Sequence, residues 1–113
     1  DTHLRLLYPD ATARARAREA VRGDSSALGV VEAAIAELEG LPRWSRDDIK
    51  AAFKRVGDAR GVRGRALFHP LRMALFGAES GPDLGALSES VGREDVVDRL
   101  QDTLSGGEGR ATR

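Results

Sequence analysis

The chain has 113 residues, 18 Lys and Arg against 18 Asp and Glu, and no cysteine, so its formal net charge is zero. This length fits one domain, or two small subdomains that share a core. The absence of cysteine excludes disulfides and thiolate metal sites, and two distant histidines are too few for a metal cluster. The apolar runs are short and the first ten residues lack the apolar stretch of a signal peptide. We therefore expect a cytoplasmic protein with no membrane partner.

The charge is unevenly distributed along the chain. Between Arg43 and Arg72 nine basic residues stand against three acidic ones, a net charge of +6, so the rest of the chain carries −6. Zero net charge taken alone argues against a nucleic-acid partner. A basic segment of this size nevertheless supports a nucleic-acid partner, because a local positive patch attracts phosphates whatever the total charge.

Ala, Arg, Leu, Glu and Asp dominate, while β-branched and aromatic residues are scarce. This composition favours helices over strands, so we predict an all-α fold. Residues 11–21 alternate Ala and Arg and predict a solvated helix with almost no apolar face. Residues 27–39 predict a second helix, ended by Gly40 and Pro42, with one buried stripe at helical spacing: Leu28, Val31, Ala34, Ile35 and Leu38.

The sequence WSRDDIKAAFKRVG, residues 44–57, predicts a third helix. Ser45 is a good N-cap, and Asp48, three residues later, approximates a capping box. Lys50 and Lys54 are four residues apart and share an exposed face. We expect Gly57 to end the helix, residues 57–64 to form a mobile basic loop, and the following side chains to be buried: Ile49, Ala52, Phe53 and Val56.

Three further helices are expected. Pro70 suits the first position of a helix that runs to Phe76 and stops at Gly77, while residues 66–68 turn once into the core. Leu71, Ala74 and Leu75 share one face of it, and Arg72 projects from another. The last two helices are expected at residues 82–91 and 93–104. Residues 105–113 have no apolar anchor and are expected to be disordered.

The sequence offers no catalytic constellation. The acidic pairs Asp47/Asp48 and Glu94/Asp95 lie at predicted helix starts, where capping explains them. The glycines of residues 57–64 are irregularly spaced and follow no strand, unlike a phosphate-binding loop. No serine lies in a nucleophile elbow, and the histidines have no triad partners. We expect no catalytic residue, no metal site and no cofactor in this chain.

A binding function is better supported. The basic loop and its neighbouring faces can meet phosphates, although an ordinary solvated charged surface explains the charges equally well. Arg72 favours binding, because a guanidinium can hydrogen-bond base edges and stack on bases, which single-stranded RNA loops expose. The structural alternative for Arg72 is an ion pair with Glu79 or Asp83.

The stretch GVRGRALFHPLRMALFGAESGPDL, followed by VGREDVVDRLQ, closely resembles the C-terminal anticodon-binding region of bacterial glutamyl-tRNA synthetases. The resemblance rests on a Gly-basic-Gly-basic segment, a Pro-Leu-Arg core and a Gly-Pro-x-Leu turn. The helix WSRDDIKAAFKRVG fits the same region. The resemblance divides the chain into three parts: a weakly matched N-terminal helical segment, an anticodon-binding-like domain and a tail, at residues 1–27, 28–104 and 105–113.

The resemblance implies an all-helical class I synthetase anticodon-binding domain, with short helices in one or two small subdomains that form a cage. In the family the arginine of Pro-Leu-Arg faces the anticodon, and the Gly-Pro turn meets its bases. These positions correspond to Arg72, Gly81, Pro82 and Leu84, and nearby residues would add phosphate or base contacts: Lys54, Arg63, Arg65 and His69. The family commonly has Thr where this chain has Phe76, and often Met or Gln in place of His69.

The implied function is recognition of a tRNA of the glutamate type through its anticodon loop, as a contribution to glutamylation. The class I motifs His-x-Gly-His and Lys-x-Ser-Lys are absent, so the chain is expected to be non-catalytic alone. It is either a fragment of an ATP-dependent glutamate–tRNA ligase, with a catalytic domain in cis, or a free-standing protein that acts with one in trans; the poor match of residues 1–27 favours the second. The alternative, supported by zero net charge, is a helical protein-interaction module that kept the scaffold and lost RNA binding.

Overall fold

The computed structural model describes residues 11–77 and 83–105, with side chains described from residue 15 onward. These residues form helices and no strand, which confirms the predicted all-α fold. The helices follow one another along the chain as α2 (Ala11–Arg22), α3 (Ser25–Glu39), α4 (Arg46–Arg60), α5 (Arg65–Phe76), α6 (Leu84–Val91) and α7 (Arg93–Ser105).

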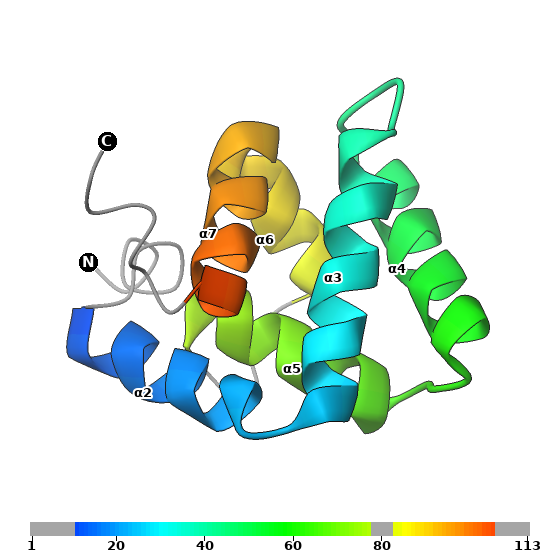
Figure 1. Cartoon of the computed structure of the whole chain (residues 1–113). Helices are drawn as coiled ribbons and strands as arrows, with labels where there is room; N and C mark the ends of the chain where they lie inside the picture. Colours follow the sequence, from blue (N-terminus) through cyan, green and yellow to red (C-terminus); the bar gives the residue numbers. More distant parts are fainter. Residues whose placement is uncertain (1–10, 78–82, 106–113) are drawn as a thin grey trace.

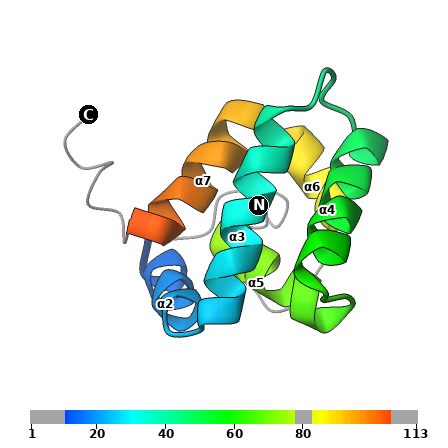
Figure 2. The same ribbon diagram turned by 45° about the vertical axis from the view of Figure 1, so that its right-hand side comes forward.

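Helix α3 is the central element of the arrangement and packs against α2, α4, α5 and α7 (Figure 1). In that view α2 and α5 lie across the lower ends of the upright helices, and α2 also contacts α5 and α7. Figure 2 shows α6 beside α4, with which it packs, while the start of α5 lies below α4. The last turn of α4 and the first turn of α5 are therefore neighbours.

The described helices share one hydrophobic core. Each of the six contributes to a single cluster of buried side chains, from Val21 in α2 to Leu100 in α7. The largest fully buried side chains come from four helices: Phe53, Ile49, Leu38, Leu71, Leu75 and Leu100. The predicted stripe of α4 is confirmed, since all four of its apolar residues are buried.

The prediction that α2 is a solvated helix is wrong. Ala17 and Val21 are only 1% and 3% exposed, and they lie four residues apart on one face. The guanidinium of Arg22 also donates a hydrogen bond to the carbonyl of Leu104 at 2.6 Å. Alternation of Ala with Arg hid this narrow face, because a small alanine allows close helix packing while contributing little to an apolar pattern.

Helix α3 begins at Ser25, two residues before the expected start at residue 27. Asp24 is its N-cap, and the Asp24 carboxylate accepts hydrogen bonds from the backbone N–H groups of Ser26 and Ala27 at 3.0 and 3.2 Å. Three residues of the predicted stripe, Val31, Ala34 and Leu38, are buried as expected, whereas Leu28 and Ile35 are only partly buried. The buried face also includes residues outside that stripe: Ala27, Gly29 and Val30. A helix enclosed on several sides has no single apolar stripe.

Helix α4 begins as predicted and ends later. The Ser45 hydroxyl accepts the backbone N–H of Asp48 at 3.2 Å and donates to the Asp48 carboxylate at 2.9 Å, which confirms the N-cap. The predicted end at Gly57 is wrong, because the helix runs on to Arg60 and stops at Gly61 in the left-handed conformation, with φ +71°. The expected loop of residues 57–64 is therefore reduced to residues 61–64.

Gly57 serves close packing inside the helix. A Cβ atom at this position would lie 2.7 Å from the Val62 carbonyl oxygen and 2.9 Å from a methyl group of Leu67. The backbone N–H of Val62 donates to the carbonyl of Gly57 at 3.0 Å. The absence of a side chain at Gly57 lets the chain turn back tightly and start α5 against the end of α4.

Helix α5 starts five residues before the proline that was expected to begin it. Pro70 lies inside the helix and is buried, so the predicted start is wrong. A proline inside a helix loses one backbone hydrogen bond and crowds the preceding turn, and burial of the apolar face offsets this cost. Leu71, Ala74 and Leu75 are buried, as predicted. The predicted end of the helix at Gly77 is also confirmed.

The last two helices agree with the prediction except at their ends. Asp83 is the N-cap of α6, whereas the expected start at Pro82 lies outside the described residues. Helix α6 ends at Gly92 as expected. Ser105, placed in the disordered tail by the sequence analysis, closes α7, and residues 106–113 are outside the described part of the chain.

Phe53 is 1% exposed, so its ring should be one of the main contributors to the stability of the core. We expect Phe53→Ala to lower the free energy of unfolding by about 3–5 kcal/mol, because it removes apolar contacts and leaves a cavity. Chemical denaturation measures this change. A loss below about 1 kcal/mol would contradict the assignment of Phe53 to the centre of the core.

Gly57→Ala tests the close approach of α4 to α5. We expect a loss of about 1–3 kcal/mol, because the new methyl group would meet a backbone oxygen that cannot move freely. Gly40→Ala is the matched control, since Gly40 has φ −86° and only ordinary contacts around its Cβ position. That change should leave stability unchanged or raise it by up to about 1 kcal/mol. Equal effects of the two substitutions on denaturation would refute the packing argument.

Candidate nucleic-acid interface

A groove of about 580 Å³ lies between the outer side of α4 and the first turns of α5. Its lining comes from three consecutive parts of the chain: α4, the turn of residues 61–64, and α5. The residues that line it are Lys50, Ala51, Lys54, Gly57, Asp58, Val62, Arg63, Gly64, Leu67 and Phe68. We call this feature the α4–α5 groove.

Three cations and one carboxylate line the α4–α5 groove. Lys50 and Lys54 are one turn apart on α4, and Arg63 comes from the turn that follows; all three are exposed. Asp58 is the acidic residue of the lining. Three of the nine cations of the 43–72 segment are thus gathered in one groove, which is the arrangement that attracts phosphate groups.

The outward face of α5 continues this surface. Arg65, Phe68, His69 and Arg72 fall at positions i, i+3, i+4 and i+7, which lie on one side of a helix. Arg65 and Phe68 are exposed, whereas His69 and Arg72 are half-buried. The Nδ1 atom of His69 is buried and has no hydrogen-bond partner in the described part of the chain.

Asp83 fastens the start of α6 to α4. Its carboxylate accepts hydrogen bonds from Arg46 Nε at 2.8 Å and from the backbone N–H of Ala86 at 3.0 Å, and Lys50 Nζ lies 3.8 Å away. The hydrogen bond from Arg46 holds the pKa of Asp83 below its ordinary value. Because Asp83 lies beside Lys50, it offsets part of the positive charge at that end of the α4–α5 groove.

Further contacts keep α6 close to the start of α4. The Trp44 indole donates to the carbonyl of Ser88 at 3.2 Å, and the backbone N–H of Arg46 donates to the Glu89 carboxylate at 3.1 Å. A Cβ atom on Gly85 would lie 2.6 Å from Cγ of Lys50. Helix α6 therefore packs against the stem of Lys50 and fixes one wall of the surface.

The structure distributes the expected site residues over three places. Lys54 and Arg63 line the α4–α5 groove, and the adjoining face of α5 carries Arg65, His69 and Arg72. Gly81 and Pro82 lie outside the described residues, as does Glu79, one of the two ion-pair partners considered for Arg72. Leu84 is 3% exposed and belongs to the core, so its side chain is not available to a ligand.

Two residues of the groove were missed as site residues by the sequence analysis. Lys50 was placed on the same exposed face as Lys54 but was not counted in the site. Phe68 was expected to turn into the core, yet it is 39% exposed. Its neighbour Leu67 takes the buried position, and the next residue of a helix points about 100° away. The pattern Arg65–Phe68–Arg72 on one helical face is the signal that would have found Phe68.

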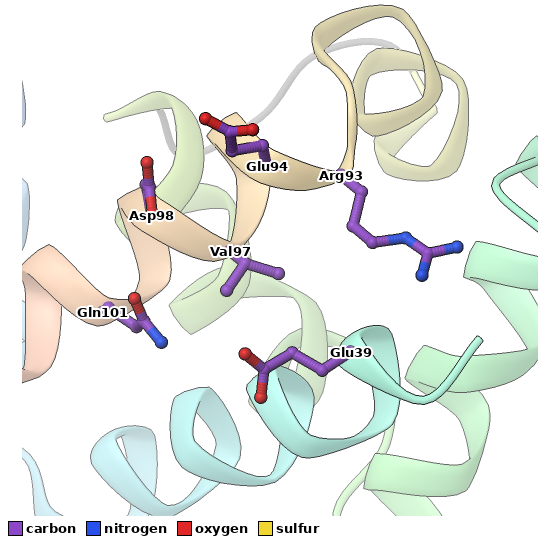
Figure 3. Close-up of a pocket in the computed structure, with 6 residues that line it drawn as sticks. All are labelled: Glu39, Arg93, Glu94, Val97, Asp98 and Gln101. Carbon is purple, nitrogen blue, oxygen red and sulfur yellow. The ribbon is translucent and has the colours of Figure 1, made fainter.

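A second groove, of about 490 Å³, lies between α3 and α7 and has a different character (Figure 3). It is lined by Glu39, Arg93, Glu94, Val97, Asp98 and Gln101. Figure 3 shows Glu39 extending from α3 toward α7. The guanidinium of Arg93 lies 5.5 Å from the centre of the Trp44 ring. Three carboxylates against one arginine make this groove unfavourable for phosphate.

The comparisons with known proteins define the class of the molecule. The family model described as "Anticodon binding domain" matches residues 5–104, and the chain belongs to this family. The match includes α2, which also contributes Val21 to the common core. No solved structure matches the chain significantly.

The similar proteins indicate more closely which kind of anticodon binding domain this is. The chain is 36% identical to the glutamate–tRNA ligase of Halalkalibacterium halodurans over 85 residues, which are 75% of this chain and 18% of that protein. It is 39% identical to the ligase of Listeria monocytogenes over 85 residues, covering 75% and 17%. The Bacillus subtilis ligase is 32% identical over 96 residues, covering 85% and 20%. The chain thus spans about a fifth of the length of these relatives, and the predicted resemblance to a glutamyl-tRNA synthetase anticodon-binding domain is confirmed.

The described residues also bear on membrane and metal sites. Among the described helices none is long and apolar enough to cross a membrane. Within residues 11–77 and 83–105, no three His, Asp or Glu side chains come together in a group that could hold a metal ion.

The Asp83 contacts predict a pH dependence of stability. Since the folded-state pKa of Asp83 is lowered, its contribution to stability is present at neutral pH and is lost as pH falls below about 4. Asp83→Asn keeps an N-cap residue and removes the charge. We expect the difference in unfolding free energy between wild type and Asp83→Asn to shrink between pH 6 and pH 3. A difference that stays constant over this range in urea denaturation would contradict the assigned contacts.

Proposed function

We propose that the chain binds the anticodon arm of a tRNA through the α4–α5 groove and the outward face of α5. The observation that carries this proposal is the convergence of Lys54 and Arg63 in one groove, although they come from different segments. Phosphate contacts need positive charge at a suitable distance, and such contacts supply most of the affinity for nucleic acid. Membership in the family of anticodon binding domains supports the same ligand.

The residues of this surface have different roles in the proposal. Lys54, Arg63 and Arg65 hold phosphates, since they are exposed and their charge suffices for that task. Arg72 reads a base, because it is half-buried and its guanidinium is therefore more restricted in direction. His69, one turn before Arg72 on the same face, adds a contact from its imidazole.

We further propose that the tRNA is of the glutamate type and that the chain contributes recognition to its glutamylation. The support is that the relatives quoted above are named glutamate–tRNA ligases. The chain contains neither class I signature motif, so glutamate activation would be carried out by a catalytic domain, in the same polypeptide or in a separate one. A protein-interaction module without RNA binding is the outcome that the following experiment would reveal instead.

Single substitutions distinguish a residue that reads a base from residues that hold phosphates. Arg72→Ala should weaken binding of a glutamate-type tRNA by about 1–3 kcal/mol and reduce its advantage over an unrelated tRNA. Arg63→Gln should weaken all tRNAs alike and reduce the salt dependence by about one released counterion. The measurement is fluorescence anisotropy of labelled tRNA over a salt series, with circular dichroism to show that each variant is folded.

Arg16→Gln provides the matched control. It removes the same charge from an exposed position on α2, a helix that contributes no residue to the lining of the groove, and should leave binding nearly unchanged. Absence of binding by wild type at low salt would reject RNA binding in favour of the protein-interaction module. Equal binding of every tRNA, unaffected by Arg72→Ala, would keep RNA binding and reject base reading by Arg72.

A further inference from the structure

Phe68 is the one large apolar side chain that is exposed in the described part of the chain, at 39%. It lies in the first turns of α5 and lines the α4–α5 groove together with Lys54 and Arg63. Its exposure follows from helix geometry, because Leu67 and Leu71 already occupy the buried face. The ring is therefore held at the surface by a rigid, well-packed helix.

The surroundings of Phe68 limit what can cover it. The groove brings three exposed cations beside the ring, together with Asp58 and two small residues, Gly57 and Gly64. An apolar side chain of a protein partner would cover the ring but would also take these charges out of water, which is costly unless they are paired. A nucleotide meets both requirements, since its base can stack on the ring while its phosphates stay near the cations.

An unpaired nucleotide fits this groove better than a duplex does. In a double helix the flat faces of the bases are stacked on one another and cannot reach an aromatic side chain. Single-stranded loops can splay their bases out, and proteins then stack those bases on aromatic residues. An aromatic face inside a basic groove is the usual arrangement of sites for single-stranded nucleic acid.

We propose that Phe68 is a stacking platform for one unpaired nucleobase, whose flanking phosphates lie at Lys54 and Arg63. This inference rests on the proposed function and adds to it a residue and a ligand class: an unpaired loop nucleotide, not paired RNA. Stacking by a phenyl ring does not read base edges, so Phe68 contributes affinity for any base, and discrimination between bases is left to polar groups such as Arg72.

The test uses two probes at low salt: a single-stranded oligoadenylate of seven nucleotides and a blunt RNA duplex. Phe68→Leu should weaken binding of the single strand by roughly 5- to 150-fold, the effect of losing one stacked base. The slope of log K against log salt should stay unchanged, because no charge is removed. Phe68→Tyr should retain binding, and neither substitution should affect the weaker binding of the duplex.

Lys54→Gln is the matched control from the opposite wall of the groove. It should weaken the single strand and the duplex alike and reduce the salt slope by about one counterion, which the loss of Phe68 should not do. Phe68→Trp gives a direct readout, since stacking of adenine on the new indole should quench its fluorescence. The change is measured against the wild type, in which Trp44 is the only tryptophan.

The outcomes separate this inference from the proposed function. If wild type binds tRNA while Phe68→Leu binds the oligoadenylate as tightly as wild type, and Phe68→Trp is not quenched, the stacking platform is rejected and the proposed function stands. If wild type binds neither tRNA nor the oligoadenylate, both are rejected. Self-association of the chain that Phe68→Leu abolishes, with RNA binding unchanged, would assign Phe68 to a protein interface instead.

Discussion

The close approach of α4 to α5 at Gly57 is the constraint on which the functional surface depends. Any side chain at this position would collide with the backbone at Val62, so the chain can turn back within residues 61–64 only because the position is a glycine. The turn carries Arg63 to the side of α4 that presents Lys54, and it starts α5 with Phe68 facing the same space. A packing requirement of the core thereby sets the distances within a surface site.

A second set of contacts balances charge on that surface. Asp83 caps α6, pairs with Arg46 and lies beside Lys50, so one carboxylate joins two helices and also reduces the positive charge at one end of the groove. Charges that serve structure and charges that serve binding are thus next to each other on α4. This explains why a count of basic residues between Arg43 and Arg72 overstates the charge available to a ligand.

The sequence predicted the helical class, the interior of α4 and several helix ends, because these depend on local signals such as the Ser45 cap and glycine stops. The sequence did not predict the features that depend on contacts between segments far apart in the chain. Gly57 appeared to end a helix, Pro70 appeared to start one, and α2 appeared solvated, yet in each case packing against another helix overrides the local preference. The site was partly predictable, since Lys54 and Arg63 belong to an evident basic segment. The exposure of Phe68 was not, because it depends on which neighbour takes the buried position.

The α4–α5 groove carries three cations and one carboxylate, whereas the groove between α3 and α7 carries three carboxylates and one arginine, so charges of opposite sign gather at two different places on the domain. The molecule measures 32 × 31 × 28 Å, whereas charges in water are screened over about 8 Å at physiological ionic strength. A polyanion near the α4–α5 groove is therefore almost unaffected by the carboxylates of the groove between α3 and α7. At this ionic strength the net charge of the whole chain matters little for its approach. At about 0.01 M salt the screening length is about 30 Å, comparable with the width of the domain, so both grooves then act on an approaching polyanion and their opposite charges turn the basic groove toward it before contact.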